Sequence, residues 1–373
     1  MRILHILNHI EKVGNGIVNM AVDLACSQAK DNHQVGVASL GGEYEALLAS
    51  YGIKHFAIDQ EDRTPINLLK ASRRYRAIIQ EFQPDIVHAH MMTGVVLART
   101  LRGKAKYKLV STVHNEFQRN AVLMGLADRT IAVSKAVQER MVQRGIPQRK
   151  LRVVQNGTIG SPRTRALADY QPMQLQHPAI ATVAGMYTRK GIAELIDAFV
   201  EIASEFPQAH LYLVGDGCDR PQFEAQAQST SLSDRIHFEG FQSEPQRYLL
   251  STDIFVLASH RDPSPLVLPE AREAGCAIVA TAVDGIPEAL EGGHAGILVP
   301  PRDSHALAEA LAQLLSDRDR LYQWKERAKQ NLEWLNVTRV HQQTLAVYQE
   351  LLAYSSKSQK SEASSQKPTY HNT

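Results

Sequence analysis

Residues 179–215 read "AIATVAGMYTRKGIAELIDAFVEIASEFPQAHLYLVG", an apolar run, a helical pattern and a second apolar run. We expect strands over 179–185 and 209–215 and a helix over 191–206. Parallel strands need a long crossover of this kind, usually a helix, whereas antiparallel strands can be joined by a tight turn. The stretch therefore predicts a parallel sheet with helices packed on it.

The same alternation occupies most of the chain on both sides of this unit. Before it, strands are expected at 2–7, 34–40, 85–90, 108–114 and 129–134, and helices at 17–30, 65–82 and 135–145. After it, strands are expected at 235–240, 253–258 and 277–281. This order predicts an α/β protein with two Rossmann-like, doubly wound parallel-sheet domains facing across a cleft.

The breaks in the pattern set the expected domain boundaries. The segment 161–178 has no clear period and holds three prolines, which indicates a linker between domains at 1–160 and 179–335. A last helix over 336–354 is expected to pack back toward the N-terminal domain. The polar, repetitive tail at 355–373 is expected to be disordered.

Composition excludes several classes of protein. The 373 residues hold 41 Lys and Arg against 39 Asp and Glu, a balance that argues against a dedicated nucleic-acid binder. Cys26, Cys218 and Cys276 lie far apart and outside any CxxC pair, which indicates reduced thiols and a cytoplasmic location. No apolar run approaches the ~20 residues of a membrane-spanning helix, so any membrane contact would be peripheral, on the inner face.

Polar residues and glycines gather where the expected strands end. In an open parallel sheet, ligands bind beyond these carboxyl ends. The segments concerned are "VGNG" (13–16), "HAHMMTG" (88–94), "HNEF" (114–117), "GMYTRKG" (185–191), "EGF" (239–241), "SHRD" (259–262) and "VDGIPE" (283–288). If the two carboxyl edges face each other, all of them line one cleft.

The segment "SHRDPSPLVLPEAREAG" (259–275) places Asp262 and Glu270 on either side of seven residues, three of them proline. Proline favours an extended loop and suits the first turn of a helix, so we expect a helix to begin near Pro269–Glu270. Glu270 would suit a neutral diol such as a ribose. The alternatives are a carboxylate that only complements the helix dipole, worth roughly 0.3–1 kcal/mol, and, for Asp262, a surface ion pair of little value.

This segment, with its continuation "AREAGCAIVAT", resembles the E-x7-E signature of the retaining glycosyltransferases of family 4 (group 1), which have the GT-B fold. Further segments stand in the order of that family: "GNGIVNMAVDLA", "PDIVHAH", "STVHNEF", "LYLVGDG", "DRIHFEGF", "STDIFVLAS", "GIPEAL" and "GILVPPRD". Any one of them is weak, but the set is specific and covers nearly the whole ordered chain.

The resemblance implies a role for individual residues. Donor binding would fall to Gly16 in the first loop, Gly240 and Phe241 beside the base, the amides of Leu266 and Val267 on the distal phosphate, and Glu270 on the ribose. Arg189 and Lys190 would neutralise the diphosphate, while His114 and Asp262 would contact the transferred sugar. His88 and His90 share a strand face, so one is expected in the core and the other toward the acceptor.

The sequence departs from the family pattern in three places. Asp262 stands where Glu is usual, Met186 where Arg is common, and Asn15–Gly16 replaces a glycine pair. The shorter Asp262 side chain bears on the choice of sugar and on activity, because hydrogen bonds weaken steeply with distance. Arg189 is the candidate to supply the charge missing at Met186.

The resemblance implies transfer, with retention, of a sugar from a UDP- or GDP-linked donor to an acceptor hydroxyl in surface polysaccharide or glycolipid assembly. No metal is expected, and Asp317 and Asp319 are interpreted as a solvated turn. A nucleotide-sugar 2-epimerase and a non-catalytic sugar-nucleotide sensor are the alternatives. The basic runs at 70–76 and 99–108 are solvated faces or contacts with anionic lipid, which would suit a lipid-linked acceptor.

Overall fold

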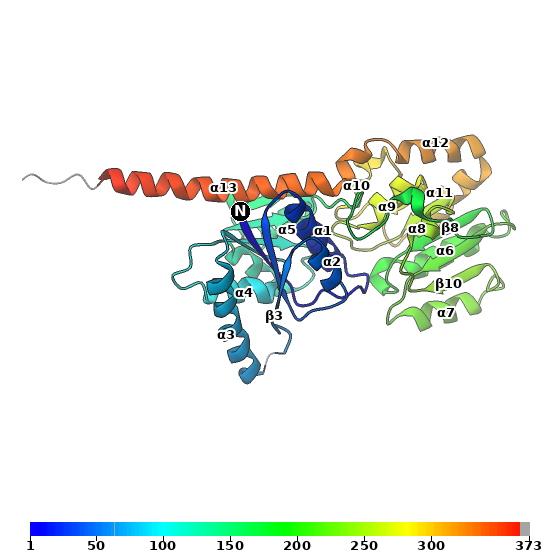
Figure 1. The fold of residues 1–373 in the computed structure, drawn as a ribbon. Coiled ribbons are helices and arrows are strands. Elements are labelled where there is room, and N and C mark those ends of the chain that lie inside the picture. The colour runs from blue at the N-terminus through cyan, green and yellow to red at the C-terminus, as the bar shows by residue number, and fades with distance from the viewer. Residues whose placement is uncertain (63, 366–373) are drawn as a thin grey trace, which may run out of the picture.

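The computed structural model describes residues 1–62 and 64–365, with the surroundings of side chains given as far as Ala353. It contains two parallel sheets, one in each half of the chain, with helices on their faces (Figure 1). The predicted α/β class with two doubly wound domains is confirmed.

The N-terminal sheet has seven parallel strands in the order β3-β2-β1-β4-β5-β6-β7. These are β1 (Arg2–Ile6), β2 (Gln34–Ser39), β3 (Lys54–Ala57), β4 (Ile86–Ala89), β5 (Lys108–Val113), β6 (Arg129–Ala132) and β7 (Leu151–Val153). The helices between them are α1 (Gly16–Lys30), α2 (Glu45–Ser50), α3 (Pro65–Phe82), α4 (Met92–Thr100) and α5 (Lys135–Gln143). Because β1 pairs with both β2 and β4, the strand order reverses there, which is where open sheets bind ligands.

The C-terminal sheet has six parallel strands in the order β10-β9-β8-β11-β12-β13. These are β8 (Ala179–Val183), β9 (His210–Val214), β10 (Ile236–Gly240), β11 (Ile254–Leu257), β12 (Ala277–Thr281) and β13 (Ile297–Val299). Its helices are α6 (Ile192–Ile202), α7 (Arg220–Gln228), α8 (Gln246–Leu249), α9 (Val267–Ala274), α10 (Ile286–Ala289), α11 (Ser304–Ser316) and α12 (Arg318–Ala328). The order reverses between β8 and β11.

Both faces of each sheet are buried, which explains why most strand residues are apolar. In β1, Leu4 and Ile6 pack toward α3 and α4. Ile3 points to the opposite face of the sheet, where it packs against α13 (Val337–Ser365). Successive strand residues point to opposite faces, so both helical layers need apolar partners from the same short strand.

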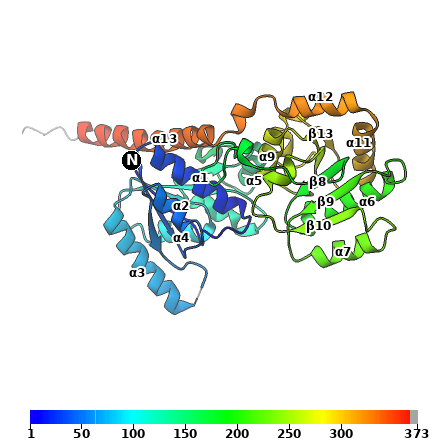
Figure 2. The ribbon, with the colours of Figure 1, turned by 45° about the vertical axis from the view of Figure 1, so that its right-hand side comes forward.

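The chain passes between the domains twice, and the two passages lie side by side. The amide of Ile159 donates to the carbonyl of Leu335 at 3.1 Å, and the amide of Val337 donates to the carbonyl of Ile159 at 3.0 Å. Helix α13 then returns along the N-terminal domain, where Val347 and Tyr348 are buried against its sheet (Figures 1 and 2). The second passage ties the last helix to the first domain.

Helix α13 runs to Ser365 rather than ending at 354, so the expectation of disorder is wrong for 355–365. The packed turns of α13 nucleate the helix, and adding further turns to a nucleated helix costs little free energy. Residues 355–365 contain no Gly or Pro that would end it. Residues 366–373 lie outside the described residues. Neither α13 nor any other helix in the described ranges is long and apolar enough to cross a membrane.

Candidate functional site

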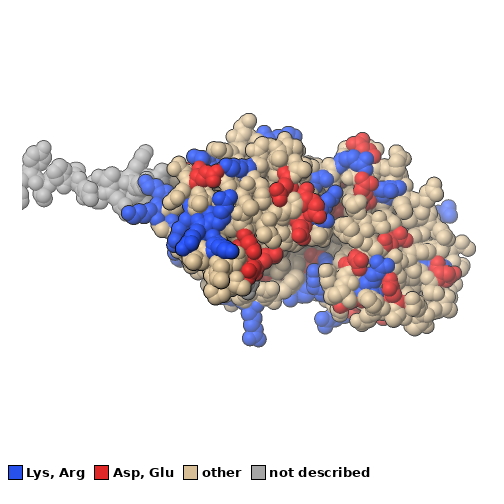
Figure 3. Space-filling model, turned by 60° about the horizontal axis from the view of Figure 1, so that its bottom comes forward, with Lys and Arg blue, Asp and Glu red and all other residues tan. Residues whose placement is uncertain are grey.

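The loops beyond the carboxyl ends of the two sheets meet between the domains. A methyl group placed on Gly16 would lie 3.4 Å from Cδ1 of Leu266, and one on Gly14 would lie 3.6 Å from the ring of Phe241. The two glycines follow β1, whereas Phe241 follows β10 and Leu266 follows β11. A recess separates the domains on the face shown in Figure 3. The predicted cleft between carboxyl edges is therefore present, and Gly16, Phe241 and Leu266 lie beside it.

Helix α9 begins at Val267, with Leu266 at its N-cap, so the expected start near Pro269–Glu270 is two residues late. Proline is tolerated at the third helical position because the first N–H groups of a helix have no partner inside it. The amides of Leu266 and Val267 are consequently free of helical hydrogen bonds. They provide the donors that an anion needs at a helix start.

Two side chains of the N-terminal domain hold the loop that leads into α9. Asn156 Nδ2 donates to the carbonyl of Ser264 at 3.1 Å, and Thr158 Oγ1 donates to the carbonyl of Leu266 at 3.4 Å. With both carbonyls directed at the first domain, the loop is fixed relative to it. The position of the free amides therefore depends on residues that follow β7 in the other domain.

Glu270 lies in the first turn of α9 and is half-buried, yet it has no hydrogen-bond or ion-pair partner among the described residues. Burial raises the pKa of this carboxyl to about 7, against the opposing charge of Arg163 and with the support of Asp23. Arg163 itself is engaged by Asp23 through two contacts, of 2.8 and 2.9 Å. A desolvated carboxylate without a partner is placed to accept hydrogen bonds from a ligand.

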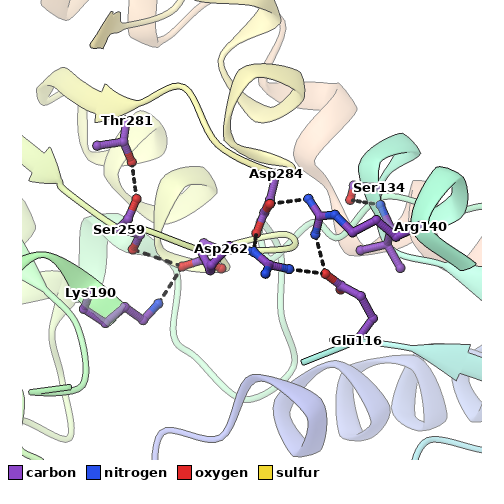
Figure 4. Close-up of polar contacts among 10 residues, drawn as sticks. Glu116, Ser134, Arg140, Lys190, Ser259, Asp262, Thr281 and Asp284 are labelled. Carbon is purple, nitrogen blue, oxygen red and sulfur yellow. Dashed lines mark hydrogen bonds and ion pairs between the residues drawn. The ribbon is translucent and has the colours of Figure 1, made fainter. Parts of the chain in front are cut away.

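Asp262 is buried and paired with Lys190, which rules out the surface ion pair considered above. Lys190 Nζ donates to Asp262 Oδ2 at 2.5 Å, and Ser259 Oγ lies 3.5 Å from the same oxygen (Figure 4). The other oxygen, Oδ1, has no hydrogen-bond partner within the described part of the chain. Two of the predicted residues are thus in direct contact, and each keeps free hydrogen-bonding capacity.

Arg189 lies apart from this pair, on the exposed side of the loop after β8. Its guanidinium lies 5.5 Å from the ring centre of Phe117, in the first domain, and 5.7 Å from that of Tyr187. Met186, which stands where Arg is common, carries no charge and is fully buried in the core of the C-terminal domain. Arg189 is the cation of this loop that reaches across to the N-terminal domain.

His114 follows β5 and is half-buried, with Nε2 3.1 Å from Nδ1 of His90. Burial lowers its pKa to about 3, so the imidazole is neutral. His88 and His90 are both buried, which corrects the expectation that one of them faces the acceptor. Because β4 is covered on both faces, the side that these histidines share points into the domain, and His90 reaches the cleft only through His114.

Gly240 ends β10 with φ +70°, and a methyl group there would lie 3.2 Å from Arg220. The following Phe241 is 53% exposed, which is unusual for so large an apolar ring, and faces Gly14 across the cleft. An exposed aromatic ring beside a cleft offers a surface on which a planar group can stack.

A four-residue ion-pair cluster across the cleft was not anticipated from the sequence. Arg140 and Arg261 each contact both Glu116 and Asp284, with Arg261 Nε 3.1 Å from Asp284 Oδ2 (Figure 4). Each domain supplies one acid and one base, and both carboxylates are buried. Three of the four residues lie in segments that were predicted at strand ends, "HNEF", "SHRD" and "VDGIPE". The spacing of these segments gave no sign that Arg261 would contact Glu116 and Asp284.

Asp317 is the N-cap of α12, where its Oδ1 accepts hydrogen bonds from the amides of Asp319 and Arg320 at 3.0 Å. Of the two acids that resemble a metal-binding motif, Asp317 therefore caps the helix and Asp319 lies in its first turn, not in a solvated turn as expected.

Comparison with known proteins gives two complementary family matches. Residues 171–331 match the model for "Glycosyl transferases group 1", and residues 14–158 match that for "Glycosyltransferase Family 4". The two matches together cover most of the chain.

Individual relatives agree. N-acetyl-alpha-D-glucosaminyl L-malate synthase of Bacillus anthracis is 24% identical over 310 residues, 77% of this chain and 80% of that protein. The putative colanic acid biosynthesis glycosyltransferase WcaL of Escherichia coli is 26% identical over 68% of this chain and 67% of its own. Lipopolysaccharide core biosynthesis glycosyltransferase LpsE of Rhizobium meliloti is 27% identical over 50% of this chain, which spans about half of that protein.

Solved structures show the same fold. Anabaena Alr3699/HepE in complex with UDP and glucose has a TM-score of 0.78 and 20% identity, covering 93% of this chain and 99% of that one. WaaG, a glycosyltransferase involved in lipopolysaccharide biosynthesis, has a TM-score of 0.74 and 14% identity over 93% of this chain and 99% of its own.

Proposed function

The chain belongs to the group 1 glycosyl transferases, and we propose that it moves a sugar, with retention, from a nucleotide-diphosphate sugar to an acceptor hydroxyl. The observation that carries this proposal is Glu270, a desolvated carboxylate that has no partner among the described residues and lies in the turn whose first amides are free. One helix start then offers donors for a phosphate and an acceptor for a diol.

The donor would lie along the cleft with its diphosphate at the start of α9. The amides of Leu266 and Val267 would hold the distal phosphate, and Glu270 would accept hydrogen bonds from the ribose hydroxyls. Phe241 would stack on the base beside Gly240. Gly16 would let the first loop approach the donor, because it presents no side chain to Leu266.

The leaving group needs positive charge, since negative charge grows on the phosphate as the anomeric bond breaks. Lys190 has three N–H donors, and among the described residues only Asp262 engages one, which leaves two for phosphate oxygens. Arg189 adds a guanidinium on the exposed side of the same loop. These cations and the helix-start amides are the reason to expect activity without a metal, which full activity in the presence of EDTA would support.

The sugar itself would be held by Asp262 and His114. Asp262 Oδ1, which no described residue engages, would accept a hydrogen bond from a sugar hydroxyl, and neutral His114 would add a contact from the other domain. Retention would follow from attack on the face that the phosphate leaves, with a phosphate oxygen taking the proton of the acceptor hydroxyl. UDP and GDP sugars are the donor candidates.

A donor screen tests the proposal. The full chain is incubated with UDP- and GDP-sugars and with lipopolysaccharide or oligosaccharide acceptors, and nucleotide release and product mass are measured. A transferase yields nucleoside diphosphate and a heavier acceptor, whose anomeric configuration NMR then compares with that of the donor. An isomeric donor would instead identify a 2-epimerase, and binding without turnover a sensor; either result would contradict the proposal.

Surface polysaccharide or glycolipid is the acceptor class that we propose. Two relatives support this choice, because their names assign them to lipopolysaccharide core biosynthesis and to colanic acid biosynthesis. Within the screen, an acceptor with a lipid portion should be used better than its delipidated form.

We further propose that the N-terminal domain contacts anionic lipid through α3. Figure 3 shows Lys and Arg gathered in a patch on this domain. Ile66 and Leu69 are 70% and 53% exposed, and they share a helix face with the exposed Lys70 and Arg73. Apolar and basic side chains together suit the headgroup region, where each basic residue contributes about 1 kcal/mol.

Vesicle flotation tests this contact. Wild type should float with vesicles that contain anionic lipid and not with zwitterionic ones, and the double substitution Ile66→Ser/Leu69→Ser should abolish flotation. Tyr322→Ser on α12, where the ring is also exposed, is the matched control and should float normally. Absence of wild-type flotation with anionic vesicles at low salt would remove the proposal.

A further inference from the structure

Gln28, His5, His90 and His114 form a hydrogen-bonded row that runs from α1 through the sheet to the cleft. Gln28 Oε1 lies 2.8 Å from His5 Nε2, His5 Nδ1 lies 2.9 Å from His90 Nε2, and His90 Nδ1 lies 3.1 Å from His114 Nε2. The first three side chains are buried, and His114, at the end of the row, is half-buried.

The polarity of the row follows from its first member. An amide oxygen can only accept, so His5 Nε2 carries a proton. Each imidazole is neutral, because burial lowers the pKa of His5 to about 4, of His114 to about 3, and of His90 well below its usual value. A neutral imidazole has one N–H, so His5 Nδ1 accepts from His90 Nε2, and His90 Nδ1 in turn accepts from His114 Nε2.

A second arm leaves the other end of the same amide. Gln28 Nε2 donates to the hydroxyl of Tyr348 at 3.4 Å, and that hydroxyl lies 2.6 Å from His88 Nδ1. His88 Nε2 is in turn 2.7 Å from Thr112 Oγ1. Gln28 therefore links the two arms: its oxygen accepts from His5, and its NH2 group donates to Tyr348 of α13.

We propose that Gln28, His5 and His90 are positioning residues that hold His114 as its Nε2–H tautomer, so that Nδ1 presents a lone pair to the cleft and accepts a hydrogen bond from a hydroxyl of the transferred sugar. His114 Nδ1 has no partner among the described residues, and the chain places no other ring nitrogen of the row at the cleft. The part that concerns the sugar rests on the proposed function, whereas the tautomer does not.

The same histidines could be taken for a metal site, since ring nitrogens of His5, His88 and His90 lie within 4.8 Å of one another. Every ring nitrogen of the three already has a hydrogen-bond partner at 2.6–3.1 Å. A metal would have to break several of these bonds, whereas the row satisfies all of them.

NMR of the full chain with 15N-labelled histidine tests the tautomer without any ligand, because long-range 1H–15N spectra separate protonated from bare ring nitrogens. We expect His5, His90 and His114 to carry the proton on Nε2 at neutral pH and to remain neutral down to pH 5. Protonation of His114 on Nδ1 in the wild type, or a stoichiometric metal bound by the purified protein, would overturn the proposal.

The substitution Gln28→Met keeps the size of the side chain and removes its hydrogen bonds to His5 and to Tyr348. His114 should then populate both tautomers, and kcat/KM for the sugar donor should fall about 3- to 10-fold. Affinity for the nucleoside diphosphate, which lacks the sugar, should not change. Gln60→Met is the matched control, since Gln60 is buried in the same domain and its Nε2 donates to the carbonyl of Leu7 rather than to a histidine.

The outcomes separate the row from the function. An unchanged His114 spectrum in folded Gln28→Met contradicts the positioning role, as does an equal shift in Gln60→Met. If Gln28→Met does not fold, the wild-type spectrum alone still decides the tautomer. An Nε2–H tautomer in an enzyme whose His114→Ala variant turns over normally would support the row and refute the sugar contact.

Discussion

Asp262 and Glu270, the two acids separated by seven residues, have different environments that the sequence pattern does not distinguish. Asp262 is buried beside a cation that lies 2.5 Å away, whereas Glu270 has no partner within the part of the chain that the structure describes, and its pKa is raised. The spacing and the prolines indicated that both belong to one loop and helix. They could not indicate the environments, because Lys190 comes from the loop after a different strand, β8.

Substitution of Lys190 should therefore act on stability as well as on catalysis. Lys190→Met leaves Asp262 buried without its cation, which should lower the free energy of unfolding by roughly 3 kcal/mol. Adding Asp262→Asn should recover part of that loss. Denaturant unfolding of the two single variants and the double variant measures the coupling, and strictly additive losses would contradict a direct interaction.

Donor affinity should depend on pH through Glu270. Ribose hydroxyls donate to the ionised form, so the carboxyl must lose its proton before it can accept both of them. With a pKa of about 7 in the free protein, affinity for the nucleoside diphosphate should weaken as pH falls below 7, approaching tenfold per pH unit. Glu270→Gln should remove this dependence. Titration calorimetry from pH 5.5 to 8.5 makes the comparison, and an identical slope in both proteins would exclude the role.

At the scale of elements, long periodic segments were predictable and short ones were not. The βαβ unit at 179–215 appears as expected, although α6 ends at Ile202 rather than 206. The edge strands β3, β7 and β13 are 4, 3 and 3 residues long and were not anticipated. Such runs carry too few residues for a period to show, and only pairing with a neighbouring strand makes them strands.

The loop before α9 should be sensitive to its supports in the other domain. Asn156→Ala removes the bond to the Ser264 carbonyl, which should cost about 1 kcal/mol of stability. It should also weaken nucleoside diphosphate binding several-fold, because the loop that carries the helix-start amides loses one of its supports. Asn67→Ala, which removes a 2.8 Å bond to the Asp62 carbonyl far from the cleft, should leave binding unchanged. Equal affinities for wild type and Asn156→Ala would separate the loop from the phosphate.

At the scale of the molecule, contacts between the domains decide the shape of the cleft. Arg140, Arg261 and their two acid partners come from four segments that are far apart in sequence. The strand-end rule placed Glu116, Arg261 and Asp284 at facing edges, whereas Arg140 lies within α5. Which side chains meet depends on the relative position of the two sheets. The cleft was therefore predictable and its ion-pair cluster was not.

Glu116 is the member of this cluster whose loss should open the cleft. It is buried and contacts one arginine from each domain, so Glu116→Gln weakens both contacts at once. The radius of gyration without ligand, measured by small-angle X-ray scattering, should increase and should rise further with salt. Glu291→Gln, which weakens an ion pair to Arg272 inside the C-terminal domain, should lower stability without this expansion. An unchanged radius in Glu116→Gln would show that the cluster does not hold the domains together.

A double-mutant cycle in nucleotide binding tests the account most directly. Affinities of wild type and Glu270→Gln are measured for the nucleoside diphosphate that the screen identifies and for its 2′,3′-dideoxy form, which lacks the ribose hydroxyls. If Glu270 binds the ribose, the substitution should weaken binding of the natural nucleotide roughly tenfold or more and leave the dideoxy form almost unaffected. Equal losses for both nucleotides would show that Glu270 does not recognise the ribose, and the proposed placement of the donor along α9 would fail.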